Sequence, residues 1–295
     1  MPAAIEIEAL VKRYGGHVAL DGVTLRVPVG TVYGFLGPNG AGKTTTMRIL
    51  LGLLRADAGV ARLLGHDPWS DGLQVRGRVG YLPSGAGLYR RLTGRQLLDY
   101  FSGLDRTPPV LRPDLCDALR LGDADLDRPV RSYSKGMRQK LGIIQALQHD
   151  PALAVLDEPT EGLDPLVQDG FVESLTARRA AGRTSFLSSH VLSETEALCD
   201  RAAIIRDGRI VAEGSIDDLR GGRPRRVTVE TDGPPPELPG CALVSQTGGA
   251  AVYAHHGPLP DLLRALAALD PRDVRIEEPG LDEVFRGLYD ARDDA

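Results

Sequence analysis

A phosphate-binding loop constrains the fold of this chain more than any other feature. It fits the pattern G-x-x-x-x-G-K-[ST] and consists of Gly37, Pro38, Asn39, Gly40, Ala41, Gly42, Lys43 and Thr44. An apolar strand at 31–36 precedes the loop, and a helical segment at 45–51 follows it. Backbone N–H groups and the helix N-terminus attract phosphate, Lys43 adds a positive charge, and Thr44 offers a hydroxyl to Mg²⁺. The loop therefore predicts a nucleoside triphosphate site.

The bulk properties limit the class of protein. A length of 295 residues favours a core domain with an appendage. The net charge of −5 argues against nucleic acid as the main partner. Cys116, Cys199 and Cys241 lack metal-ligand spacing, which favours a reducing compartment. No run of 18 apolar residues and no leader pattern is present, so neither a membrane span nor a signal peptide is expected.

The pattern of apolar residues predicts an α/β domain over 1–220. Strands are expected at 4–9, 17–27, 152–156 and 184–188, and a helical insertion is expected at about 85–147. Ser193 and Glu196 have the spacing of a capping box that opens a helix. Asp207-Gly208 predicts a hairpin turn between two short strands.

A second, small α+β domain is expected over 221–295. Gly- and Pro-containing residues 221–224 suggest a linker. Beyond it, the predicted elements are strands at 226–231, 242–246, 250–254 and 273–277, and helices at 259–268 and 280–289.

Two acidic residues follow the apolar run at 153–156. A buried parallel strand would deliver Asp157 to the carboxyl edge of the sheet, next to the phosphate-binding loop, where it could hold Mg²⁺. Glu158 could orient or deprotonate an attacking water. The alternative is that Glu158 only caps a helix or forms an ion pair at the surface.

At this point the chain resembles the nucleotide-binding subunits of ATP-binding-cassette (ABC) proteins, through motifs in the order of that family over 4–220. These are Tyr14, the Walker A loop 37–44, the signature-like run 132–139, the Walker B end Asp157-Glu158, the D-loop 162–165 and Ser188-Ser189-His190. The resemblance implies a P-loop NTPase fold of the ABC type, with a mixed core sheet, an antiparallel β subdomain and the inserted helical subdomain.

The resemblance also assigns roles to single residues. Tyr14 would stack on adenine, and Thr45, directly after the loop, would bind ATP together with the loop. Thr44 and Asp157 would hold Mg²⁺. Glu158 would activate water, with Lys43 and His190 stabilising the γ-phosphate. Ser134 and Gly136 would close the ATP site of a second subunit across a head-to-tail dimer, and Asp164 of the D-loop would be a further nucleotide-binding residue. Taken alone, Ser134 predicts only a capped helix, and His190 or Tyr14 would more often be packing residues.

Some positions depart from the family pattern. Ser84 stands where the family usually has a glutamine that reaches Mg²⁺ and relays to the membrane partner. The signature carries Tyr133 for Leu, Lys135 for Gly and Met137 for Gln. Because Lys135 adds a positive charge near a phosphate, we expect binding to survive these changes.

The run Gly80–Pro83, the signature and the ending 278–285 are similar to ATPases of ABC-2-type exporters, including daunorubicin-resistance ATPases. That likeness implies ATP hydrolysis at the cytoplasmic face of the cell membrane, coupled to a separate polytopic permease. The permease would dock near Leu88, Tyr89 and Arg90; the alternative for these three is a solvated loop.

Two other functions are compatible with the nucleotide site. One is a soluble ABC ATPase that acts on ribosomes or nucleic acid, which the single cassette, the acidic charge and the lack of Cys-x-x-Cys disfavour. The other is a regulator that binds ATP without turnover, which Ser84 permits and Glu158 with His190 disfavours.

Overall fold

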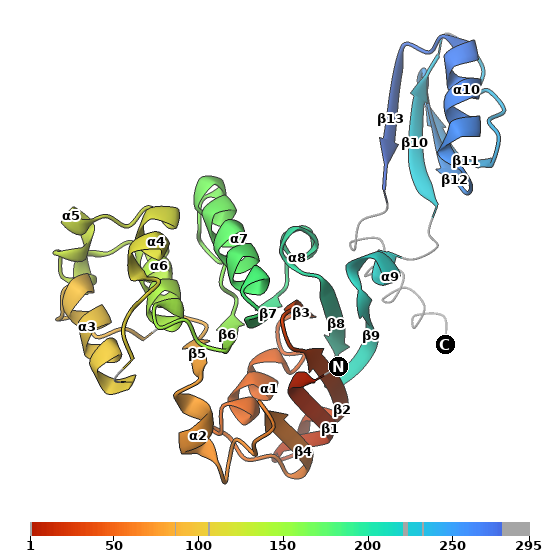
Figure 1. The fold of residues 1–295 in the computed structure, drawn as a ribbon. Helices are drawn as coiled ribbons and strands as arrows, with labels where there is room; N and C mark the ends of the chain where they lie inside the picture. The colour runs from red at the N-terminus through yellow and green to blue at the C-terminus, as the bar shows by residue number, and fades with distance from the viewer. Residues whose placement is uncertain (1, 86, 106, 221–223, 232, 279–295) are drawn as a thin grey trace. The chain divides into compact units, whose positions relative to one another are not determined.

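The structure is a computed structural model that describes residues 2–85, 87–105, 107–220, 224–231 and 233–278 (Figure 1). The chain forms two compact units that divide between Ile216 and Asp217. Residues 221–223 of the expected linker at 221–224, and the expected helix at 280–289, lie outside the described residues.

A six-stranded sheet forms the centre of the first unit. Its strand order is β5-β6-β7-β3-β8-β9, with every neighbouring pair parallel except β8 with β9. The strands are β3 (Val32–Leu36), β5 (Val79–Leu82), β6 (Leu153–Asp157), β7 (Thr184–Ser189), β8 (Arg201–Arg206) and β9 (Arg209–Ser215). Every residue of β3, β6 and β7 is buried, which is the pattern of parallel strands covered on both faces. The predicted turn at Asp207-Gly208 joins β8 to β9.

A separate three-stranded antiparallel sheet has the order β2-β1-β4. Its strands are β1 (Ala3–Tyr14), β2 (His17–Pro28) and β4 (Ala58–Leu63). Residues of these strands, of helix α1 (Lys43–Leu50) and of the large sheet share one buried apolar cluster, which includes Leu20, Phe35 and Met47. This core fixes α1, and with it the phosphate-binding loop, against the end of β3.

The helical insertion lies between β5 and β6 in the sequence. It contains α3 (Gly94–Asp105), α4 (Arg112–Ala118), α5 (Asp123–Leu126), the 3₁₀ turn η1 (Val130–Ser132) and α6 (Lys135–Leu147). The short α2 (Gly72–Arg76) precedes β5, and α7 (Pro165–Ala180), α8 (Leu192–Leu198) and α9 (Ile216–Arg220) follow β6. In Figure 1 the insertion stands apart from α1 and α2, on the side of α7.

The predicted capping box at Ser193 is wrong. Helix α8 begins at Leu192 after Val191, which has extended backbone and no side-chain cap, so Ser193 lies inside the first turn. Ser189 instead accepts a hydrogen bond from the Val191 N–H at 2.9 Å. The short turn from β7 through His190 starts the helix too early for Ser193 to take the capping position.

The second unit has a four-stranded antiparallel sheet of order β11-β12-β10-β13. It consists of β10 (Arg225–Glu230), β11 (Cys241–Thr247), β12 (Ala250–His255), β13 (Asp273–Glu277) and the helix α10 (Leu259–Leu269). Leu262 and Leu266 of α10 pack with Val227, Val229 and Tyr253 in a core of their own. The unit therefore has an independent apolar core.

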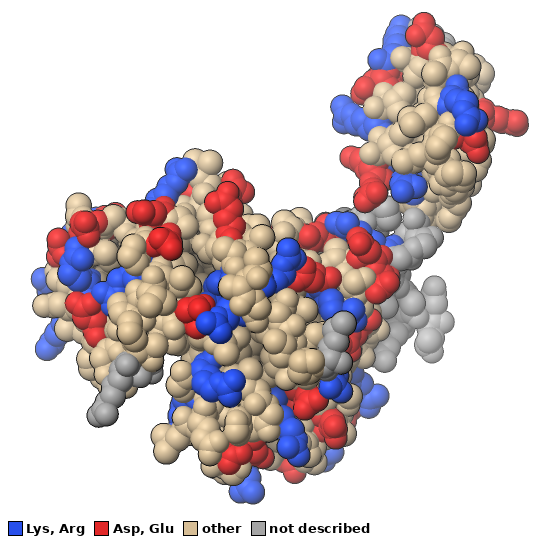
Figure 2. Space-filling view, in the orientation of Figure 1, with Lys and Arg blue, Asp and Glu red and all other residues tan. Residues whose placement is uncertain are grey.

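Acidic and basic side chains are interspersed on the face of the molecule in Figure 2, without an extended surface of one sign on that face. None of the described helices is long and apolar enough to cross a membrane.

Candidate functional site

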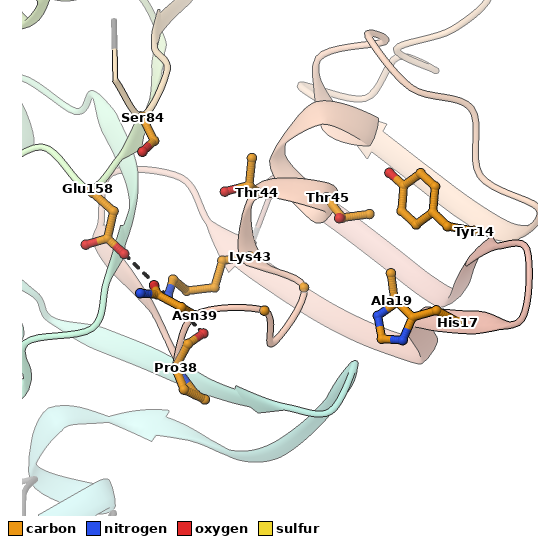
Figure 3. Close-up of a pocket in the computed structure, with 12 residues that line it drawn as sticks. Tyr14, His17, Ala19, Pro38, Asn39, Lys43, Thr44, Thr45, Ser84 and Glu158 are labelled. Carbon is orange, nitrogen blue, oxygen red and sulfur yellow. Dashed lines mark hydrogen bonds and ion pairs between the residues drawn. The ribbon is translucent and has the colours of Figure 1, made fainter.

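A polar pocket of about 290 Å³ lies over the phosphate-binding loop (Figure 3). Its predicted lining residues come from the hairpin β1–β2, the loop, α1 and the ends of β5 and β6. They are Tyr14, Pro38, Asn39, Gly40, Gly42, Lys43, Thr44, Thr45, Ser84 and Glu158. Figure 3 shows Tyr14 at one end and Glu158 with Ser84 at the other, with the loop between them. The structure thus brings together residues that are 144 positions apart, from 14 to 158.

The loop conformation depends on glycine at its second conserved position. Gly42 caps α1 with φ of 112°, and an added Cβ would lie 2.7 Å from Leu20 Cδ2 and 2.8 Å from the Ala19 carbonyl oxygen. Only glycine adopts this backbone without strain. Gly37 and Ala41 are buried beneath the loop and do not line the pocket. Gly37 and Ala41 therefore pack against the core, while the other residues of the loop face the pocket.

Lys43 and Glu158 form a buried ion pair. The Lys43 ammonium lies 3.3 Å from Glu158 Oε1, and the two side chains are 6 % and 13 % exposed. Lys43 also donates to the Gly37 carbonyl oxygen at 2.5 Å. The other oxygen of Glu158 lies 2.8 Å from His190 Nδ1. Both oxygens of Glu158 are thus engaged, and the three predicted catalytic residues form one contiguous group.

Asp157 lies beside Glu158 at the end of β6 and is 1 % exposed. Its Oδ2 accepts a hydrogen bond from Thr44 Oγ1 at 2.8 Å, and its Oδ1 accepts one from Ser188 Oγ at 2.6 Å. Burial and the Asp157 charge together raise the pKa of the neighbouring Tyr81. Oxygen ligands in this arrangement suit Mg²⁺, which binds proteins through one or two oxygen ligands and completes its shell with water and phosphate. The donor set therefore fits the predicted metal ligands, Thr44 and Asp157.

The Tyr14 end of the pocket is held by contacts from β1 to the segment before β4. Asp57 accepts hydrogen bonds from Lys12 Nζ at 2.9 Å and from the Arg13 N–H at 2.6 Å, and these contacts lower its pKa. The Lys12 ammonium lies 5.7 Å from the centre of the Tyr14 ring. Tyr14 itself is 47 % exposed, so one face is free to meet a flat ligand.

Two lining residues were not predicted from the sequence. His17 and Ala19 lie on β2, and His17 pairs with Tyr14 across the hairpin. The signal was available, because Gly15-Gly16 makes a two-residue turn that pairs Tyr14 with His17.

Three predicted residues, Ser134, Gly136 and Asp164, do not line this pocket. Ser134 is exposed and caps α6, accepting a hydrogen bond from the Met137 N–H at 3.1 Å. Asp164 caps α7 in the same way through the Val167 N–H at 3.1 Å. A Cβ on Gly136 would lie 2.8 Å from the Gly162 carbonyl oxygen. The start of α6 and the turn before α7 are thus in direct contact within one chain.

The departures from the family pattern have local structural explanations. Tyr133 is buried and its hydroxyl donates to the Asp125 carbonyl oxygen at 2.6 Å. Burial raises its pKa to about 12. Lys135 is paired with Glu161 at 2.5 Å, so its charge is partly compensated within the chain. Ser84 does line the pocket, at the Glu158 end.

Comparison with known proteins gives consistent results. The ABC transporter family model matches residues 20–161. A daunorubicin resistance ATP-binding protein of Streptomyces coeruleorubidus is 38% identical, over 97% of this chain and 95% of that protein. An uncharacterised ABC transporter ATP-binding protein of Nostoc is 44% identical, over 70% of this chain, and the match spans 62% of that protein.

A solved structure described as an ATP binding subunit of an ABC transporter has the same fold. It superimposes with a TM-score of 0.69 at 32% sequence identity, over 74% of this chain and 92% of that one. The predicted P-loop fold of the ABC type is therefore confirmed. The chain belongs to the ABC transporter family, as an ATP-binding subunit of the kind that hydrolyses ATP.

Proposed function

We propose that this chain powers an ABC-2-type exporter, with two copies closing over two ATP molecules and driving a separate membrane subunit. The observation that carries the proposal is the Lys43–Glu158–His190 group beside the Asp157–Thr44 pair. Further support comes from the relative that is named for daunorubicin resistance and aligns over nearly its whole length.

The pocket suggests how ATP would lie. The adenine would stack on the exposed ring of Tyr14, and the triphosphate would run along the loop to Lys43 and Thr45. Thr44 and Asp157 would hold Mg²⁺, which when bound would neutralise part of the phosphate charge. This orientation would place the γ-phosphate at the end of the pocket where Glu158 lies.

Entry of the phosphates would rearrange the catalytic group. Lys43 and His190 now contact Glu158, and both are suited to hydrogen-bond a γ-phosphate instead. Once freed, one carboxylate oxygen of Glu158 could accept a proton from water as the water attacks the γ-phosphorus in line, while the bond from that phosphorus to the β–γ bridging oxygen breaks and ADP leaves. Lys43 and His190 would then stabilise the charge on the transferred phosphoryl group.

The second subunit would supply Ser134, Gly136 and Asp164. Ser134 caps a helix of 13 residues, Lys135–Leu147, whose first N–H groups suit a phosphate. All three residues lie outside the pocket of their own chain, which favours a role toward another copy. Association with a permease would place the chain at the cytoplasmic face of the cell membrane, with Leu88, Tyr89 and Arg90 in the docking surface.

The two alternative functions predict different behaviour. A soluble ATPase that acts on ribosomes or nucleic acid would bind without a membrane protein. A regulator without turnover would leave Glu158 dispensable, although it is paired with both Lys43 and His190.

Purification of the chain from its host membranes in mild detergent tests the proposal. A polytopic membrane protein in stoichiometric amount is the expected companion, and its yield should fall with Tyr89→Arg, because Tyr89 is 56 % exposed. The matched control is Tyr14→Phe, which leaves the Leu88–Arg90 region unchanged. Recovery of ribosomal or DNA-bound proteins without a membrane protein would overturn the exporter proposal.

A further inference from the structure

The hydroxyl of Ser188 contacts both acidic residues of the site. It donates to Asp157 Oδ1 at 2.6 Å and accepts a hydrogen bond from the Glu158 N–H at 2.9 Å. Ser188 is fully buried, and it faces Asp157 in the register of the parallel strands β6 and β7. One side chain thus holds the carboxylate of one residue and the backbone of the next.

The backbone that Ser188 holds has an uncommon conformation. Glu158 has φ of 52°, in the left-handed region that residues other than Gly, Asn and Asp seldom adopt. A hydrogen bond to its N–H therefore selects a conformation that the chain would not favour by itself. On the other side, Gln139 Nε2 donates to the Glu158 carbonyl oxygen at 3.0 Å. Both peptide groups of Glu158 are fixed by side chains from outside its loop.

We propose that Ser188 is a positioning residue, which orients the Asp157 carboxylate toward Thr44 and holds Glu158 in the left-handed conformation that points its carboxylate at Lys43 and His190. This inference rests on the proposed function of the site. Hydrogen bonds from outer residues to a metal-binding carboxylate commonly affect metal affinity or activity by about 10- to 100-fold when removed.

The same strand supplies a matched control. Ser185 lies three positions earlier on β7, is 1 % exposed, and its hydroxyl has no hydrogen-bond partner among the described residues. Ser185→Ala removes the same atom from the same strand without breaking a contact. Any difference between the two alanine variants therefore reports on the contacts of Ser188 rather than on loss of a buried hydroxyl.

The experiment compares the full-length chain with Ser188→Ala and Ser185→Ala. Steady-state ATPase gives kcat and KM, and titration calorimetry gives ATP affinity in EDTA and at increasing Mg²⁺. For Ser188→Ala we expect kcat to fall about 10- to 100-fold and half-saturating Mg²⁺ to rise about tenfold or more. Affinity for ATP in EDTA should not fall, because the phosphate-binding loop is unchanged and any weakening of the Glu158–Lys43 contact would favour the phosphates. Ser185→Ala should match the unsubstituted chain in every measurement.

Equal kcat and equal Mg²⁺ dependence in the two alanine variants would overturn the inference. If Ser188→Ala does not fold, Ser188→Cys fills the site with a slightly larger group that is a weaker donor. We expect at least a threefold loss of kcat for this variant, and no loss would equally overturn the inference. If the unsubstituted chain hydrolyses no ATP, the proposed function fails. The Mg²⁺ dependence of ATP binding would then still decide whether Ser188 orients Asp157.

Discussion

His190 Nδ1 lies 2.8 Å from Glu158 Oε2, so the residue expected to sense the γ-phosphate is in contact with the residue expected to activate water. The other carboxylate oxygen of Glu158 is paired with Lys43. The two side chains that contact Glu158 are thus the ones that the proposed mechanism assigns to the γ-phosphate. On that proposal, ATP binding would be a competition with Glu158 for Lys43 and His190, and it would link occupancy of the site to release of the base.

Glu158→Gln is expected to tighten ATP binding while it removes hydrolysis. The amide no longer attracts Lys43 or repels the triphosphate, so we expect roughly fivefold higher affinity, which corresponds to about 1 kcal/mol. Loss of the base should lower kcat about 100-fold or more. Calorimetry and a phosphate-release assay measure the two effects. Glu173→Gln, an exposed position on α7, is the control and should change neither. Weaker ATP binding in Glu158→Gln would contradict the competition.

Tyr14→Ala should weaken ATP binding by about 1–3 kcal/mol, because a base stacked on an aromatic ring contributes about that much. The ring is half exposed, so its removal should leave the fold intact. Tyr14→Phe keeps the ring and should bind ATP like the unsubstituted chain. Dissociation constants for ATP and for inorganic triphosphate measure the effect, since only ATP carries the base. An equal loss for both ligands would show that Tyr14 acts on the phosphates instead.

Two helical glycines should respond to alanine in opposite directions. A Cβ at Gly170 of α7 would lie 2.2 Å from the Ala118 carbonyl oxygen, so Gly170→Ala should destabilise the chain by about 1–3 kcal/mol through overpacking. Gly103 of α3 has open space around its Cα, and Gly103→Ala should raise stability by about 0.5 kcal/mol through helix propensity. Urea unfolding measures both. Equal changes in the free energy of unfolding for the two variants would show that α4 and α7 do not approach each other this closely.

The second unit should lose stability on acidification through His255. Burial, followed by the charges of Arg225 and His256, lowers the pKa of this histidine, which is 2 % exposed. His255 titrates at about pH 6.5 in the unfolded chain and at a lower pH in the folded chain. Above about pH 6.5 the imidazole is neutral in both the folded and the unfolded state, so it does not reduce the free energy of unfolding of the second unit. As the pH falls through the folded pKa, the unfolded state gains protons first and that stability is lost.

Hydrogen exchange of residues 250–255, corrected for intrinsic rates between pH 8 and 5, measures this loss. His255→Leu should remove the pH dependence, and His256→Gln, at an exposed position, should keep most of it. A pH dependence that is unchanged in His255→Leu would assign the effect to another group.

The strands and the nucleotide loop could be predicted because their signals are local. The apolar run before Asp157 predicts β6, and the loop pattern with its flanking strand and helix predicts the site at Lys43 and Thr44. The start of α8 could not be predicted from Ser193, because the turn after β7 decides where that helix begins.

The contacts of Ser188 and Gln139 were not predictable from spacing. Ser188 meets Asp157 because β6 and β7 are neighbours in a particular register, and the sequence does not specify strand order. The left-handed backbone of Glu158 is equally invisible in the sequence, because it follows from hydrogen bonds that two distant segments make to it. Residue identities thus indicate which groups are candidates for the chemistry, whereas their orientation depends on tertiary contacts.

Sedimentation of the Glu158→Gln chain with and without Mg-ATP tests the central claim of a two-chain ATP site most directly. The account predicts a monomer of 31.6 kDa without nucleotide and a particle of twice that mass with Mg-ATP. Ser134→Arg, which crowds the exposed start of α6, should prevent the doubling and leave ATP binding to the chain's own pocket intact. A Glu158→Gln chain that binds Mg-ATP and remains at 31.6 kDa would contradict the account.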